Sequence, residues 1–382
     1  MTNYIVQQCI NGLQLGSIYA LIALGYTLVY GIIKLINFAH ADIFMVGAYI
    51  AFFVVSFYAG MSSFPPSICV LISLAIAYLI TSVCWEKFIK NKFEFFIQNN
   101  IHLFFKKTII AIFKLASMAI LTVAIYPVFY LSIKIVFSFK LGSLLFPVLI
   151  IYVMFVCAIL GITMERIAYK PLREKPRLLA LITALGVSYF LENFCSLPFV
   201  FENKYRAFPE IISRSEIIHI PVIKVAITNI FAINIIICSI LLFCLWFFVE
   251  KTLTGKQMRA VAYNHHVASL MGIDVNKIIS LSFAIGPALA GVSGILYAMN
   301  YGVLQSPFLG FFPGLKAFIA AVLGGIGSLQ GAVIGAFIMG ISEVFANSID
   351  SNLGFAVAFI ILIVILLVKP TGIMGKTEQE KV

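Results

Sequence analysis

Long apolar runs separated by short polar loops fill this sequence from end to end. A run of about 20 apolar residues can cross a bilayer as a helix. Hydrophobic residues make up 62% of the chain and charged residues 11%, whereas a soluble domain has roughly 45–50% and about 25%. The sequence therefore predicts an integral membrane protein and excludes a soluble globular one. The runs that predict crossings are residues 13–33, 43–59, 66–85, 115–133, 144–164, 178–197, 227–249 and 278–300.

The last apolar stretch is rich in glycine. Residues 315–346 predict two short helices joined near Gly327, and residues 355–368 predict a final crossing. The spacing of Gly327, Gly331 and Gly335 is typical of close helix packing, although a re-entrant segment beside a pathway has a similar composition. We therefore predict an all-α, polytopic membrane protein with about 11 transmembrane or re-entrant helices.

Basic residues collect in the loops between the apolar runs. Lys and Arg number 26 against 15 Asp and Glu, and they concentrate in residues 86–107, 166–177 and 251–277. Cytoplasmic loops of membrane proteins carry an excess of Lys and Arg, so we place these loops in the cytoplasm. The N-terminus is then outside, and the tail 370–382 is cytoplasmic. Because the basic residues form no single dense face, we expect no nucleic-acid partner.

The sequence contains no recognisable catalytic or metal-binding constellation. The five histidines are scattered apart from His265 and His266, and the seven cysteines include no CxxC pair. A Gly-Lys-Thr triplet ending at Thr377 resembles part of a phosphate-binding loop, but that motif needs glycine where Pro370 stands. We therefore expect no enzyme activity, no metal and no cofactor. Active transport would take its energy from a partner ATPase or from an ion gradient.

Charged residues inside the apolar runs are few. Glu192, Lys316 and Glu343 are the strong candidates, and such residues serve either ion coupling or polar contacts between helices. The polar interruption at residues 37–42 has a later counterpart at 324–330, and paired interruptions can mark a translocation pathway. One such pair does not establish an internal repeat.

The polar segment 250–277 carries signals of ordered structure. Its sequence TLTGKQMRAVAYNHHVASLMGIDVNKI predicts helix on both sides of Asn264, a stop at Gly272 and an N-cap at Asp274. Small residues give this loop a low profile that can seat in a groove of another protein. We interpret it as a cytoplasmic coupling element that uses Arg259, Ala260, Ala262, Ala268 and Gly272.

Several segments resemble one family of transport proteins. RAVAYN, ASLMGID and SFAIGPALAGVSG are similar to the coupling loop and following helix of branched-chain amino-acid ABC-transporter permeases. The resemblance implies an H-type permease, a single transmembrane domain over residues 1–382 in the bacterial inner membrane. Four more segments resemble the family in the same order: NGLQLGSIYALIALGYTLVYGIIKLINFAHADIFMVGAY, MERIAYKPLR, GLKAFIAAVLGGIGSLQGAVIGA and KPTGIMG.

The resemblance also implies partners and a cargo. Such a permease pairs with an M-type permease, two cytoplasmic ATPase subunits that hydrolyse the ATP, and an external substrate-binding protein. The family imports leucine, isoleucine and valine. Urea and short-chain amide permeases resemble the same family, so the sequence leaves that cargo open. A stand-alone carrier or channel is a further alternative, favoured only if the protein works without an ATPase.

Three features depart from the family pattern. Ala41 stands where the family has glycine in NFAHG, so we expect a reshaped turn. His265 and His266 replace acidic or other polar residues, which indicates either a pH-sensitive surface toward the ATPase or surface drift. Residues 60–140 add two spans to about nine that match the family. The inserted loop 86–107 interleaves Phe with Lys, which predicts contact with anionic membrane lipid.

Polar residues near the apolar runs are our candidates for the pathway of an alternating-access mechanism. An amino acid needs transient partners for its ammonium and carboxylate groups while its side chain crosses an apolar path. The same residues can instead cap or cross-link helices. The candidates are Asn37, His40, Asp42 and Glu343.

Overall fold

The computed structural model describes most of the chain, in two compact units. One unit comprises Met1–Val55 with Phe146–Val382, and the other is Ser56–Leu145. The predicted lipid-facing loop 86–107 and most of the predicted tail 370–382 lie outside the described residues. Those residues are 2–35, 37–60, 66–84, 115–127, 130–131, 144–173, 175–198, 200–220, 225–304 and 307–375.

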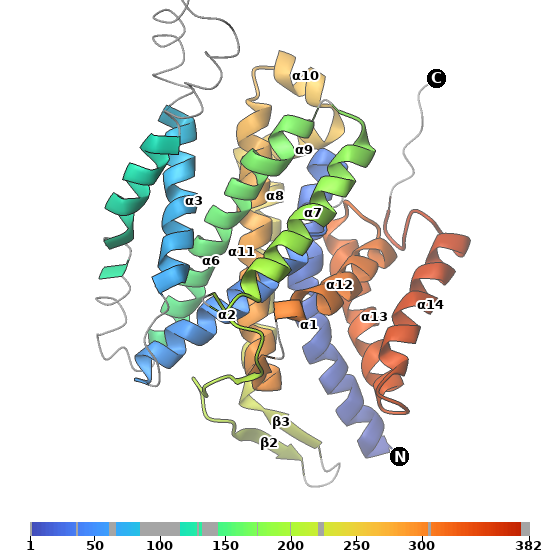
Figure 1. The fold of residues 1–382 in the computed structure, drawn as a ribbon. Helices are drawn as coiled ribbons and strands as arrows, with labels where there is room; N and C mark the ends of the chain where they lie inside the picture. Colours follow the sequence, from blue (N-terminus) through green and yellow to red (C-terminus); the bar gives the residue numbers. More distant parts are fainter. Residues whose placement is uncertain are drawn as a thin grey trace, which may run out of the picture. The chain divides into compact units, whose positions relative to one another are not determined.

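The fold is all-α, as predicted (Figure 1). Seven helices of the described residues are long and apolar enough to cross a membrane, and four apolar helices are shorter. In the smaller unit, α3 (Pro66–Cys84) and a helix at Leu115–Pro127 match two predicted runs. The larger unit contains α1 (Thr2–Ile33), α2 (His40–Tyr58), α6 (Leu145–Met164), α7 (Arg177–Cys195), α8 (Asn229–Lys251), α11 (Val275–Tyr301), α12 (Phe311–Gly324), α13 (Leu329–Asn347) and α14 (Leu353–Val368).

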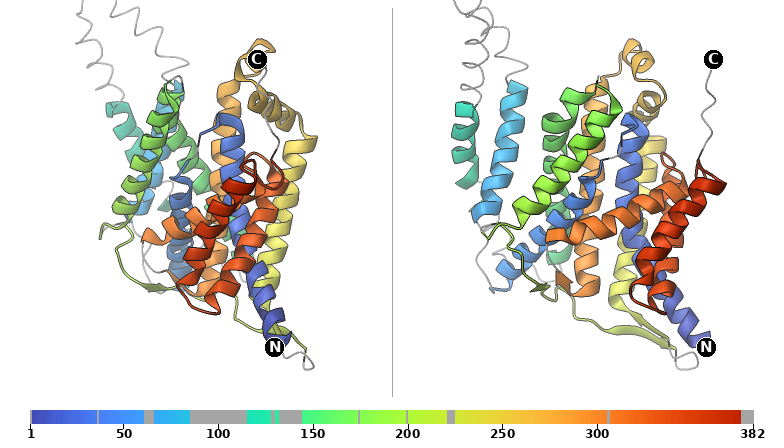
Figure 2. Two further views of the ribbon diagram at one scale, coloured as in Figure 1. Left: turned by 90° about the vertical axis from the view of Figure 1, so that its right-hand side faces the viewer. Right: turned by 45° about the vertical axis from the view of Figure 1, so that its right-hand side comes forward.

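Short elements fill the connections of the larger unit. Two antiparallel strand pairs are present in the described part, β1 with β4 and β2 with β3. The helices α9 and α10 lie at one end of α1, and the N-terminus lies at the other end with the β2–β3 hairpin (Figures 1 and 2). The short elements are β1 (Arg206–Ala207), β2 (Glu216–Ile220), β3 (Val225–Thr228), β4 (Val303–Leu304), η3 (Glu165–Tyr169), η4 (Lys170–Leu172), η5 (Pro307–Gly310), α9 (Leu253–Tyr263) and α10 (His265–Leu270).

The first helix starts earlier than predicted. We placed its start at residue 13, but α1 begins at Thr2. The amides of Gln7, Gln8 and Asn11 interrupt the apolar pattern but do not break a helix, because only proline and glycine disfavour its interior strongly. The added turns carry polar side chains at the end of the helix farthest from α9 and α10.

Helix α1 is the centre of the larger unit, packed against α13, α11, α12 and α8. Small residues let the backbones approach closely. A Cβ atom built on Gly340 of α13 would lie 2.4 Å from the Gly16 nitrogen of α1. A Cβ atom on Gly47 of α2 would lie 2.5 Å from Gly291 Cα of α11. Any side chain at these glycines would push the helices apart.

The predicted packing glycines near α13 divide into two kinds. Gly331 and Gly335 do pack closely, since a Cβ atom on either would lie within 2.3 Å of a carbonyl oxygen of α12. Gly327 does not, and its prediction as a packing residue is wrong. It has φ +99° in the turn between α12 and α13, a conformation that L side chains rarely adopt, with no atom within 4 Å of a Cβ built there.

Candidate functional site

The loop between α8 and α11 folds as its capping residues predict. Helix α9 ends before Asn264, whose side-chain oxygen accepts hydrogen bonds from the backbone N–H groups of His266 (2.9 Å) and Val267 (3.1 Å) at the start of α10. Gly272 then adopts φ +81°. Asp274 Oδ1 accepts from the Lys277 backbone N–H at 3.2 Å. These caps satisfy N–H groups that a helix start leaves free, so the loop is ordered.

Electrostatics favour the ionised form of the cap on α11. Hydrogen bonds from the Lys277 side chain and backbone lower the pKa of the Asp274 carboxyl below its ordinary value. The Lys277 ammonium group lies 3.1 Å from Asp274 Oδ2. A carboxylate at the start of a helix also faces the positive end of the helix dipole.

The predicted coupling residues occupy different environments in this loop. Ala260 and Gly272 are exposed, and Ala262 is half-buried. The Nη1 atom of Arg259 donates to the Val249 carbonyl (2.6 Å), so this side chain fastens α9 to the end of α8. Ala268 is only 3% exposed. Our placement of Ala268 on the surface is therefore wrong, because its side of α10 packs inward against the neighbouring helices.

Large apolar side chains, not small ones, dominate the exposed surface of this loop. Tyr263 is 87% exposed, Leu270 75% and Met271 77%. These three side chains were not predicted, because small residues were expected to form this surface. Exposed apolar clusters on a polar segment mark interaction surfaces. We call Tyr263, Leu270 and Met271 the loop patch.

One histidine ties the loop to α1. The Nε2 atom of His265 lies 2.6 Å from the carbonyl oxygen of Ile32, in the last turn of α1. The last carbonyl groups of a helix have no partner within it, so the imidazole N–H supplies one. The adjacent His266 is exposed. The adjacent histidines were noticed in the sequence, but nothing there indicates that one of them binds α1.

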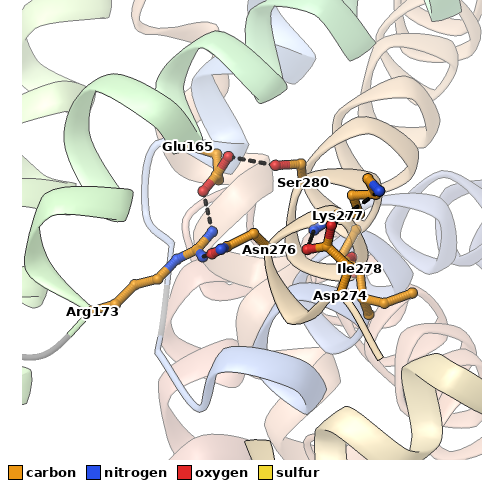
Figure 3. A network of polar contacts seen from close by, with 8 residues as sticks. Glu165, Arg173, Asp274, Asn276, Lys277, Ile278 and Ser280 are labelled. Atoms are coloured by element: carbon orange, nitrogen blue, oxygen red, sulfur yellow. Dashed lines mark hydrogen bonds and ion pairs between the residues drawn. The ribbon is translucent and has the colours of Figure 1, made fainter. Parts of the chain in front are cut away.

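A second network ties the start of α11 to the segment MERIAYKPLR (Figure 3). Glu165 of η3 is fully buried and pairs with the Arg173 guanidinium group. Its other oxygen accepts a hydrogen bond from Ser280 Oγ of α11 at 2.8 Å. Arg173 also donates to Asn276 Oδ1 at 2.5 Å. A buried charge needs a partner and further hydrogen bonds, and Glu165 has both, so this connection is firm.

The segment after α1 folds back into the helix bundle. Lys34 has φ +58°, and α2 begins at His40 beside Tyr26, with 4.8 Å between the ring centroids. Tyr26 lies seven residues before the end of α1, about 10 Å back along that helix. Within a membrane, backbone that is not helical is tolerated only where other parts of the protein surround it. Asn37 is buried there and accepts a hydrogen bond from Tyr169 of η3 at 2.5 Å.

The start of α12 meets the start of α2 at this point. A Cβ atom built on Gly310 would lie 2.7 Å from the Ala41 carbonyl oxygen, and one on Gly314 would lie 2.0 Å from Ala41 Cβ. We call this meeting of two helix starts the junction. The predicted counterpart of the early interruption, residues 324–330, is instead the turn between α12 and α13. Sequence spacing does not reveal which interruptions touch.

The expected reshaped turn at Ala41 is wrong. This residue lies in the first turn of α2, and among the described non-glycine residues only Lys34 and Glu202 have positive φ. A helical residue needs no glycine for its backbone. The methyl group of Ala41 fits because Gly314 leaves room for it.

Two junction side chains are buried without ordinary hydrogen bonds. His40 is 1% exposed and Asp42 is fully buried. In the part of the chain that the structure describes, neither ring nitrogen and neither carboxylate oxygen has a partner in hydrogen-bond geometry. Ser188 of α7 is near enough to interact with Asp42, as the Ile22 carbonyl is with His40. Intramembrane ionisable groups without firm partners are candidates for a transport function.

Glu343 lies apart from the junction, in an ion pair. Its Oε1 is 2.5 Å from Lys316 Nζ of α12, and its Oε2 accepts a hydrogen bond from the Tyr19 hydroxyl of α1 at 2.8 Å. The Lys316 ammonium group also lies 4.1 Å from the ring centroid of Phe355 on α14. We call Tyr19, Lys316 and Glu343 the ion-pair cluster. It connects helices. A polar contact between helices is the predicted alternative to a transport role for Glu343.

Metal ligands do not gather in the described part of the chain. No group of three or more His, Cys, Asp or Glu side chains is placed there to hold a metal ion.

Known proteins resemble this chain over nearly its full length. Residues 8–368 match a family described as branched-chain amino acid transport system / permease component. The high-affinity branched-chain amino acid transport system permease protein LivH of Escherichia coli is 34% identical over 381 residues, which cover 99% of this chain and 98% of that protein. BraD of Pseudomonas aeruginosa, with the same description, is 34% identical over 379 residues, with the same coverage.

More distant relatives match a smaller part. The guanosine ABC transporter permease protein NupP of Bacillus subtilis is 27% identical over 158 residues, which cover 39% of this chain and 44% of that protein. No solved structure matches the chain.

Proposed function

Because the chain belongs to the branched-chain amino acid permease family, we propose a mechanism in which the loop of α9 and α10 drives transport through α1. The protein is a multi-pass membrane permease of an ABC importer for branched-chain amino acids. Its own residues translocate the solute, and partner subunits hydrolyse ATP. We place it in the bacterial inner membrane with its N-terminus outside and its C-terminus in the cytoplasm.

Its partners follow from the same assignment. An M-type permease completes the membrane part, two ATPase subunits bind on the cytoplasmic side, and an external binding protein delivers leucine, isoleucine or valine. The loop patch supports the ATPase contact, because Leu270 and Met271 are apolar, exposed and held on an ordered loop. Arg259, Ala260, Ala262 and Gly272 shape the same element, and Ala268 supports it from inside.

The connections of this loop carry the proposal. His265 joins it to the last turn of α1, and the Glu165–Arg173 network joins the start of α11 to η3. Tyr169 of η3 in turn binds Asn37, beside the junction. A push on the loop therefore has two direct mechanical routes to the interior. Differential binding of the ATPases to two loop positions would shift the permease between two states.

The junction is the proposed passage for the charged end of the solute. The Asp42 carboxyl group is fully buried and weakly partnered, so its oxygens can accept hydrogen bonds from an ammonium group. The starts of α2 and α12 present the positive ends of helix dipoles, which suit a carboxylate. His40 and Asn37 line the same passage, and Glu343 lies farther along α1.

Uptake and association measurements on the assembled transporter test this proposal. Cells that make all partner subunits should take up labelled leucine only with this permease, and unlabelled isoleucine should compete whereas urea should not. Competition by urea in place of isoleucine would instead assign an amide cargo.

A paired substitution tests the loop patch. Leu270→Asp with Met271→Asp should abolish co-purification of the ATPase subunits, because charge on an apolar contact is costly to bury. Ile349→Asp is the matched control, since Ile349 is 82% exposed and lies beyond the end of α13, away from the loop. Undiminished co-purification with the loop-patch variant would contradict the proposed coupling surface.

A further inference from the structure

A polar cavity opens at the end of the bundle farthest from the loop patch. Two neighbouring spaces of about 310 and about 170 Å³ share the side chains of Asn11, Gln14 and Asn300. The larger reaches the lower end of the roughly 300–1,000 Å³ range of ligand pockets. Residues of α1, α11 and α13 line the larger space, and residues of β3 line the smaller one. Figure 1 shows the N-terminus of α1 near the β2–β3 hairpin. We call this space the carboxamide cavity.

The walls of the carboxamide cavity have one dominant chemistry. Gln8, Asn11 and Gln14 come from the polar first turns of α1, Asn300 from the end of α11 and Asn347 from the end of α13. Gln14 Nε2 donates to Asn300 Oδ1 at 2.7 Å. A carboxamide has both two donor protons and an acceptor oxygen, so these walls can bind an ammonium and a carboxylate without favouring either net charge.

Among the described lining residues, one side chain is positively charged, and its hydrogen bonds go to backbone carbonyl groups. Arg214 borders the smaller space. Its Nη2 atom donates to the carbonyl groups of Met299 and Asn300, each at 3.2 Å. The guanidinium group thus holds the end of α11 in place and leaves the recognition of a ligand to the amides.

The floor of the carboxamide cavity leads to the ion-pair cluster. Leu15, Tyr301 and Val344 line the cavity. Leu15 lies one helical turn from Tyr19, and Val344 directly follows Glu343 in α13. The Tyr301 hydroxyl is close enough to Glu343 to feel its charge. A solute leaving the cavity inward therefore meets the Lys316–Glu343 pair next.

We propose that the carboxamide cavity is the entry site for the zwitterionic head group of an amino acid, and that the ion-pair cluster forms its closed floor. The inference rests on the proposed function and names the place where the solute first binds. Amides suit such a site because the solute must also leave it. In a desolvated site, a neutral partner binds a charged group more weakly than an opposite charge does. The paired charges of the floor can exchange partners with the two charges of the zwitterion.

A thiol-protection experiment on the complete transporter tests the entry site. Cys9→Ser removes a half-buried thiol of α1 and serves as the background. Asn11→Cys places a thiol at the exposed rim of the cavity, and Ser351→Cys places a control thiol at an exposed position between α13 and α14. Right-side-out vesicles are treated with a membrane-impermeant maleimide, with or without millimolar leucine, and urea serves as the control solute.

The expected pattern separates the two positions. Both thiols react from outside, and only the reaction at Asn11→Cys lowers leucine uptake, by about tenfold or more. Leucine slows that reaction several-fold, urea does not, and neither changes the reaction at Ser351→Cys. The proposal is overturned if Asn11→Cys is unreactive from outside, if its modification leaves uptake intact, or if leucine gives no protection.

Failure of the entry site is distinguishable from failure of the proposed function. Leucine uptake by the unmodified Cys9→Ser transporter reports the proposed function alone. Protection of the Asn11→Cys thiol by leucine needs binding but no transport. A transporter that imports leucine without protection would keep the proposed function and reject the cavity.

Discussion

The junction and the ion-pair cluster are both buried beside α1, but they are built in opposite ways. Tyr26 contacts the junction and Tyr19 the ion-pair cluster, seven residues apart and so on the same face of the helix. In the ion-pair cluster both carboxylate oxygens of Glu343 have partners. In the junction the oxygens of Asp42 have none in hydrogen-bond geometry within the described residues. Full pairing stabilises one arrangement of helices, whereas unsatisfied groups are available to a passing solute.

Removing half of the ion pair should have the largest effect on stability. Lys316→Met leaves Glu343 buried without its cation, and breaking a buried pair in this way costs about 3–5 kcal/mol. Thermal unfolding in detergent measures the loss. The double variant Lys316→Met with Glu343→Leu is the control and should regain most of it, because no lone charge stays buried. A single variant as stable as the parent would remove the contrast between the two clusters.

The junction should respond in the opposite sense. Asp42→Asn replaces a carboxyl group that has no firm partner with a carboxamide of nearly the same shape, so we expect the free energy of unfolding to change by less than about 1 kcal/mol. Leucine uptake should fall about tenfold or more, which corresponds to about 1.4 kcal/mol of lost interaction. Asn193→Ala, at an exposed position of α7, is the control and should leave uptake within about twofold. If the variant loses stability but each folded transporter still takes up leucine at the parent rate, Asp42 has a structural role and not a transport role.

The adjacent histidines sharpen the comparison, because only one of them contacts α1. His265→Ala removes a hydrogen bond worth about 1 kcal/mol from the end of the helix that borders the junction. Leucine uptake should fall several-fold while the ATPase subunits still co-purify. His266→Ala, with an exposed side chain, is the matched control. Equal effects of the two substitutions would argue against a specific link through Ile32.

The cap on α11 should give the smallest effect. Asp274→Ala should cost about 0.5–1 kcal/mol of stability, and Asp274→Asn should retain most of it, because asparagine also caps helices. The folded pKa of Asp274 is lowered, so its contribution is present above the unfolded pKa of about 3.9 and declines as the pH falls through the lower folded value. Unfolding at pH 7 and near pH 3 should show the alanine variant approaching the parent at the lower pH. A constant difference would contradict the assigned role of the carboxylate.

Elements fixed by local sequence were predictable. The length of an apolar run locates a crossing helix, because in lipid the backbone N–H and C=O groups of the run must hydrogen-bond to one another. Capping chemistry locates α9, α10 and the start of α11, because Asn264, Gly272 and Asp274 act on neighbours in the chain. The helical segments of the loop and their order are therefore confirmed.

Contacts between distant segments were not predictable in the same way. Nothing near Ala41 in the sequence indicates that Gly314 will face it, and nothing near Glu343 identifies Lys316 as its partner. The loop patch was missed for another reason, because exposed Leu270 and Met271 look like core residues until the helix face is known. The polar first turns of α1 were left out of the predicted crossing, which began at residue 13, although their amides line a cavity.

Helix α1 is one unbroken rod of 32 residues, about 48 Å long at 1.5 Å per residue, whereas the hydrocarbon core of a bilayer is about 30 Å thick. The chain leaves the helical conformation just after it, at Lys34, which has φ +58°. One end lines the carboxamide cavity and the other is held by His265. When a rod of this kind tilts about its middle, its ends move in opposite directions. A displacement of a few ångströms at the end held by His265 would thus be accompanied by an opposite displacement at the end that lines the carboxamide cavity.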